Sequence, residues 1–152
     1  MTNELTADSV RSRGVDLNSV LDEISGILRT VVHSGFNLQT RFDPKVGRVD
    51  APRTQLNWLF VNLVVSAYDT LRQDGKFVIT TADRRLDEAA AGELGLAPGR
   101  YVQVELAMTT GGRSPGATAL EIIRQAGGRI REKDAGESGK TFTVVFPSMP
   151  SV

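Results

Sequence analysis

Three polar side chains in residues 55–71, which read QLNWLFVNLVVSAYDTL, have types and a spacing that could bind a ligand. Asn62, Ser66 and Asp69 are four and three residues apart, so in a helix they share one face. Their side chains offer hydrogen-bonding groups that can bond the polar atoms of a ligand. This face is therefore a candidate binding surface.

The same stretch also carries the pattern of a core helix. Its apolar residues recur at intervals of three and four, as in a helix packed against a sheet. The residues of this stripe are Leu56, Leu59, Phe60, Leu63, Val64, Ala67 and Leu71. Trp58 lies between the stripe and the polar face; it is either a core-edge residue, which we favour, or an exposed anchor for a partner.

The flanking segments predict a sheet that this helix covers. Residues 17–32 and 117–126 have helical spacing, and residues 86–99 form an insert that is a short helix or a loop. Strands are expected over residues 36–42, 76–85, 100–108, 128–132 and 140–146. This order predicts an α+β fold: a two-layer sandwich whose mixed, mostly antiparallel sheet of about five strands has three helices on one face. Residues 1–14 and 148–152 are expected to be tails around one domain at residues 15–147.

Composition excludes several classes of function. Eighteen basic and eighteen acidic residues are scattered along the chain of 152 residues, which does not favour a nucleic-acid partner. No apolar run approaches the roughly 18 residues that span a bilayer, so we expect a cytoplasmic protein without a membrane partner. Without cysteine, and with His33 as the single histidine, the usual metal and thiol chemistry is absent. We interpret His33 as an ordinary helix-end residue.

The central stretch resembles the N box of the histidine-kinase-like ATPases, the GHKL or Bergerat-fold family, which usually reads like NLLxNAxDA. Here it reads NLVVSAYDT. Weaker strings in the family's order are VDLNSVLDEISGILR, LGLAPGRYVQVEL, IIRQAGGRI and GKTFTVVFP, so the resemblance covers about residues 15–147. It implies the two-layer fold predicted above. Residues 1–14 are too few for the two phosphoacceptor helices that precede this domain in sensor kinases.

The resemblance also implies an ATP site in which three parts are altered. Ser66 replaces the asparagine that holds magnesium, and Met108 occupies the place of the aspartate of DxGxG that binds adenine. Loss of that charge-assisted hydrogen bond would cost roughly 1.5–3 kcal/mol. Only three residues separate Gly112 from Gly116, where active relatives have a long lid over the phosphates. The implied site is a degenerate nucleotide pocket without cofactor or metal, lined by Asn62, Ser66, Asp69, Met108, Gly112 and Gly116.

We therefore expect an inactive ATPase or pseudokinase domain that binds another signalling or scaffold protein. The exposed side of the sheet and the pocket mouth around Ser66, Met108 and Arg113 are the candidate surfaces, with Trp58 as a further contact. The alternative is a small serine/threonine kinase of the anti-sigma type that still binds ATP. A phosphorelay adaptor and a self-assembling homo-oligomeric subunit also stay open.

Overall fold

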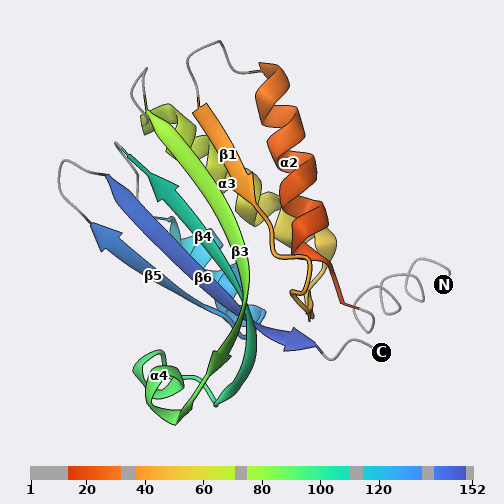
Figure 1. Cartoon of the computed structure of the whole chain (residues 1–152), viewed down its shortest axis with the longest axis vertical. Helices are drawn as coiled ribbons and strands as arrows, with labels where there is room; N and C mark the ends of the chain where they lie inside the picture. The colour runs from red at the N-terminus through yellow and green to blue at the C-terminus, as the bar shows by residue number, and fades with distance from the viewer. Residues whose placement is uncertain (1–13, 32–36, 71–74, 110–114, 135–138, 150–152) are drawn as a thin grey trace, which may run out of the picture.

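A computed structural model of the chain describes residues 14–31, 37–70, 75–109, 115–134 and 139–149. These residues form the α+β two-layer fold that the sequence predicts, with α3 and α5 behind the sheet in the view of Figure 1 and α2 beside them. The sheet runs in the order β1-β3-β4-β6-β2, with β5 paired to β6. Among the described strands only β1 and β3 pair in parallel, and the other strand pairs are antiparallel.

The described helices are α2 (Leu17–Val31), α3 (Arg53–Thr70), α4 (Glu88–Glu93) and α5 (Ala117–Gln125). Three of them are the helices expected on one face of the sheet. The fourth, α4, lies in the insert for which a short helix or a loop was expected. It begins after Asp87, whose carboxylate accepts a hydrogen bond from the Ala90 N–H at 2.8 Å, and such a cap stabilises the first turn.

The described strands are β1 (Asn37–Arg41), β2 (Arg48–Val49), β3 (Lys76–Leu86), β4 (Gly99–Met108), β5 (Arg129–Asp134) and β6 (Lys140–Met149). There are six rather than about five, because the two residues of β2 are too few to show alternation in the sequence. Strand β6 continues through Ser148 and Met149, which were expected in the C-terminal tail, because both residues pair with β2. Strand β6 is therefore three residues longer than the strand expected over residues 140–146.

The main core lies between the sheet and the helices α2, α3 and α5. Alternate residues of β3, β4 and β6 point into it, and Phe60 of α3 meets Phe146 of β6 edge to face with ring centroids 6.3 Å apart. The buried Thr81 side chain links α2 to the sheet through hydrogen bonds. Its Oγ1 donates to Asn18 Oδ1 at 2.7 Å and accepts from the Asp43 N–H at 3.0 Å.

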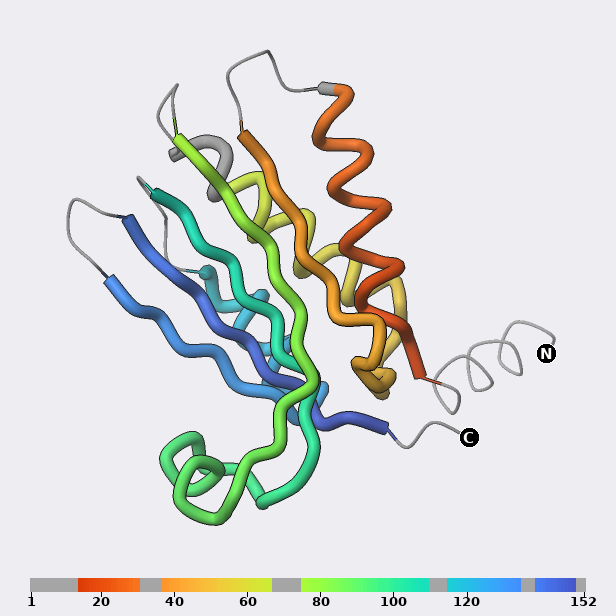
Figure 2. The backbone as a smooth tube through the Cα atoms, viewed as in Figure 1, coloured from red at the N-terminus to blue at the C-terminus, as the bar shows by residue number. Residues whose placement is uncertain are grey.

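A second, smaller core lies on the opposite side of the sheet under α4. It joins Ala91 of the helix to Leu86, Tyr101 and Val145 of three neighbouring strands. Along their strands these three side chains alternate with the main-core residues and so point to the other side of the sheet. Helix α4 therefore covers one end of the face that the other helices leave open. The rest of that face is formed by β1, β3, β4, β6 and β5, and Figure 2 shows no described helix over it.

Candidate functional site

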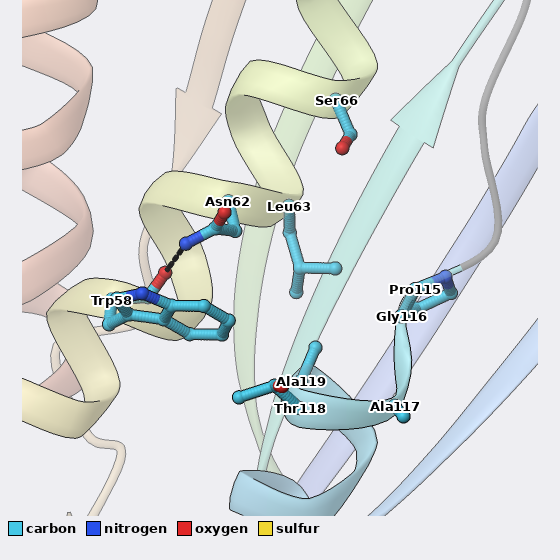
Figure 3. Close-up of a pocket in the computed structure, with 9 residues that line it drawn as sticks. All are labelled: Trp58, Asn62, Leu63, Ser66, Pro115, Gly116, Ala117, Thr118 and Ala119. Carbon is cyan, nitrogen blue, oxygen red and sulfur yellow. Dashed lines mark hydrogen bonds between the residues drawn. The ribbon is translucent and has the colours of Figure 1, made fainter.

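A shallow pocket lies between α3 and the first turn of α5 (Figure 3). Its volume is about 200 Å³. Trp58, Asn62, Leu63 and Ser66 line it from α3, and the facing wall consists of Pro115, Gly116, Ala117, Thr118 and Ala119. The pocket thus lies on the polar face of the central helix, where the sequence indicates a ligand site.

The Asn62 side chain is hydrogen-bonded to the backbone of its own helix. Its side-chain Nδ2 donates to the Trp58 carbonyl oxygen one turn earlier at 2.7 Å (Figure 3). Ser66 follows one turn later on the same side of α3 and is half-buried. This bond uses one N–H of the Asn62 carboxamide and holds the side chain against its own helix at the pocket wall.

Met108 belongs to the core and is not among the residues that line this pocket. It ends β4 opposite Phe77 of β3 and Lys140 of β6, and only 3% of its surface is exposed. Strand alternation places it on the same side as Val104 and Leu106, which point into the main core. Met108, which was expected to line the pocket, is thus a packed core residue.

The other predicted site residues divide into two groups. Gly116 is the N-cap of α5 and lines the pocket with extended backbone at φ −77°. Asp69 lies in the last turn of α3, but its side chain is outside the described part of the structure, and so are Gly112, Arg113 and His33. Of the predicted residues, the structure brings Trp58, Asn62, Ser66 and Gly116 together.

Trp58 corrects one expectation, since core packing was favoured for it. Trp58 is 44% exposed. Its exposed apolar surface is extended along the helix by Val61 and Val65, which are 42% and 44% exposed. Positions 58, 61 and 65 are three and four apart and face away from the core stripe. We call these three residues the α3 stripe. A sequence signal for it exists: the valines extend the apolar residues of the helix around its circumference.

The α3 stripe adjoins a groove between α2 and α3. Ile24, Ile27 and Leu28 of α2 line it together with Val61, Val64 and Val65 of α3. Ile27 is 59% exposed, although isoleucine is among the most frequently buried residue types. The sequence analysis missed this groove, because the two helices become neighbours only in the folded chain.

Ionisable groups in the described residues do not assemble a reactive centre at the pocket. The lowered pKa of Glu121 comes from its hydrogen bond to Arg124, and the raised pKa of Lys140 comes from its hydrogen bond to Glu132. None of these residues lines the pocket. The described residues also contain no group of three or more Asp, Glu or His that could hold a metal ion, and no described helix has the length and apolarity to cross a bilayer.

Two curated proteins show what the chain is similar to in sequence. It is 29% identical over 162 residues to the sensory histidine kinase/phosphatase NtrB of Rhizobium leguminosarum bv. phaseoli. It is 28% identical over 156 residues to NtrB of Rhizobium meliloti (strain 1021). The matches cover 91% and 88% of this chain but only 42% and 41% of the two relatives. The chain thus spans about two fifths of their length. No protein-family profile matches it.

Solved structures show the same fold. The mycobacterial sensor histidine kinase MprB superposes with a TM-score of 0.69 at 15% identity, covering 90% of this chain and 97% of that one. The nucleotide-free catalytic domain of histidine kinase ThkA gives 0.68 at 20% identity with the same coverage. ThkA crystallised in complex with the response regulator TrrA gives 0.67 at 21% identity, covering 89% of this chain and 41% of that one. The chain has the fold of histidine-kinase catalytic domains.

Proposed function

We propose that this chain, built on the fold of histidine-kinase catalytic domains, has lost ATP chemistry and acts as a signalling domain that binds another protein. The observation that carries the proposal is the α3 stripe, a row of apolar side chains on the solvent side of the central helix. Exposed contiguous apolar surface costs solubility, and in natural proteins it marks contact sites for partners. The α3 stripe lies on the side of the helix opposite its core stripe, so the packing of α3 on the sheet does not account for these apolar residues.

The pocket supports the loss of ATP chemistry. A cavity of about 200 Å³ is smaller than the roughly 300–1,000 Å³ typical of small-molecule sites. Its wall offers the serine hydroxyl of Ser66 where the family has a magnesium ligand, and the carboxylate position is taken by Met108 within the core. Magnesium needs several well-placed oxygen ligands, and an adenine amino group needs an acceptor, so both interactions are weakened.

Calorimetry with ATP and Mg²⁺ tests the loss of nucleotide binding. We expect no binding tighter than about 1 mM. Micromolar affinity, or transfer of labelled phosphate from ATP to a protein, would instead favour the serine/threonine kinase alternative.

The response regulator bound to ThkA illustrates the class of protein partner that we propose for this chain.

Capture experiments with variants test the α3 stripe. The double variant Val61→Asp/Val65→Asp places two charges on the stripe, and Leu120→Asp is the matched control because Leu120 of α5 is also 44% exposed. We expect the wild type and Leu120→Asp to retain the same protein from native lysate and the double variant to lose it. Equal capture by all three proteins would contradict the proposal. Light scattering of the purified chain checks for self-assembly, and a stripe-dependent oligomer would make a second copy the partner.

A further inference from the structure

The open face of the sheet collects basic side chains that are scattered in the sequence. Strand pairing places Arg41 of β1 with Lys76 and Arg84 of β3 on the side that α2, α3 and α5 do not cover. It places Arg129, Arg131 and Lys133 of β5 on the same side, opposite outward-facing residues of β6. Figure 1 looks onto this face, with β5 at one edge and β1 at the other. We call the six residues the basic rims.

Acidic groups are few on this face. Among the outward positions of β1, β3, β4, β5 and β6 the single carboxylate is Glu105, in the middle strand. At one end α4 adds Glu93, whose carboxylate lies 3.6 Å from the Arg131 guanidinium. The strands of the face thus carry an excess of five positive charges, although the whole chain has a formal net charge of zero. Positive charges gathered on one face of a protein attract a partner of opposite charge.

Between the basic rims, small side chains surround the longer Gln103 and Glu105 of β4. The small residues are Thr141 and Thr143 of β6, Ala107 of β4, and Val78 and Thr80 of β3. The outer strands β1 and β5 are four strand spacings apart, which is about 19 Å. A helix with its side chains is about 10–12 Å across, so it fits between the rims with its flanks beside the basic groups.

We infer that this face binds an acidic amphipathic helix of a partner protein. The helix would turn small or apolar residues to the central strands and carry Asp or Glu rows along both flanks. This inference extends the proposed protein-binding function to a second surface, on the opposite side of the sheet from the α3 stripe. A second copy cannot pair face to face here, because both faces would carry the same charge.

Other anionic partners fit the face less well. Single-stranded nucleic acid binds through exposed aromatic rings that stack on bases, whereas the aromatic residue at an outward strand position here, Tyr101, is buried under α4. Membrane surfaces are held by bulky apolar residues that insert between lipids, and the central positions carry threonine, alanine and valine instead. The Glu105 carboxylate in the middle of the face would also repel phosphate.

Fluorescence anisotropy with a synthetic peptide tests the inference on the full chain. The probe is a labelled helix about 18 residues long, roughly 27 Å, with an Ala/Val face between two Glu rows. A peptide of the same composition in scrambled order, a single-stranded oligonucleotide and phosphatidylserine vesicles are the comparison ligands. We expect the amphipathic peptide to bind with a Kd of about 10–100 μM and the scrambled peptide at least tenfold more weakly.

Charge reversal locates the site. Arg41→Glu/Lys133→Glu changes one exposed residue on each rim and should weaken binding at least about tenfold. Lys45→Glu/Arg85→Glu makes the same charge change at exposed positions outside the face and should stay within about twofold. Circular dichroism confirms that both variants are folded.

Three results would overturn the inference. One is absence of peptide binding, a second is equal loss in both double variants, and the third is tighter, rim-dependent binding of the oligonucleotide or the vesicles. None of them bears on ATP binding or on the α3 stripe, so failure here is distinguishable from failure of the proposed function.

Discussion

Replacing Met108 by aspartate tests whether this position can accept the carboxylate that the sequence resemblance leads us to expect there. Met108 is 3% exposed and packs among the main-core residues at the end of β4. Met108→Asp removes this buried side chain and introduces a carboxylate without a cationic partner. Uncompensated burial of a charge, together with lost packing, destabilises a protein by about 3–5 kcal/mol. Met108→Leu keeps apolar volume and should cost less than about 1.5 kcal/mol.

Urea unfolding followed by circular dichroism measures this cost. With a slope of about 2 kcal/mol per molar urea, a loss of 4 kcal/mol lowers the midpoint by about 2 M. Burial raises the pKa of the introduced carboxyl in the folded state above its unfolded value. The penalty is therefore largest at pH 7 and shrinks as the pH falls towards about 4, where the unfolded carboxyl also becomes protonated.

Nucleotide binding provides the second readout. We expect Met108→Asp/Ser66→Asn to leave ATP binding weaker than about 1 mM, because the pocket stays at about 200 Å³. Our account of Met108 as a core residue would be refuted if Met108→Asp were as stable as Met108→Leu at pH 7. Micromolar ATP affinity in the double variant would refute the account of the pocket.

Three further predictions follow from individual contacts. Gly128→Ala should lower the stability of the fold by at least about 2 kcal/mol, because the added Cβ would overlap the Val145 carbonyl oxygen. In Gly92→Ala of α4 the added Cβ meets no atom within 4 Å, so this variant should be more stable than the wild type by up to about 1 kcal/mol. Thermal unfolding measures both changes. Thr81→Val removes a buried hydroxyl with two hydrogen bonds and should cost about 2–3 kcal/mol in urea unfolding, while Thr81→Ser should retain most of the stability. Arg124→Ala should raise the NMR titration midpoint of Glu121, because Arg124 lowers the pKa of that carboxyl. The stabilisation from this ion pair is present above the unfolded pKa of Glu121 and is lost as the pH falls through the folded pKa. An unchanged midpoint would show that the two side chains do not interact in solution.

The fold could be predicted because its signals are local. In β4 the alternation of Val102, Val104, Leu106 and Met108 indicates both the strand and its buried side, and the structure confirms both. Residues of α3 spaced three and four apart likewise indicate its core stripe. The two-residue strand β2 had no such signal, because it exists only through its pairing with Ser148 and Met149.

The candidate site could be predicted only in part. Asn62 and Ser66 share a pocket because they lie one turn apart on a helix, which the sequence itself states. For Trp58 a place at the core edge was favoured over an exposed anchor, but the residue is 44% exposed. Helical spacing gives the direction of a side chain relative to its own helix and does not say which neighbours cover it. The facing wall at Gly116 required the fold to bring α5 beside α3.

The sequence by itself determined the longer helices and strands of the domain, since residue type and short-range periodicity carry that information. The tertiary structure decided which surfaces remain exposed. Along the chain Arg41, Lys76 and Arg131 look scattered, and strand register alone gathers them on one face. Because register depends on contacts between residues far apart in sequence, the basic rims became visible only in the folded chain. The fold also decided that no neighbouring element covers the α3 stripe.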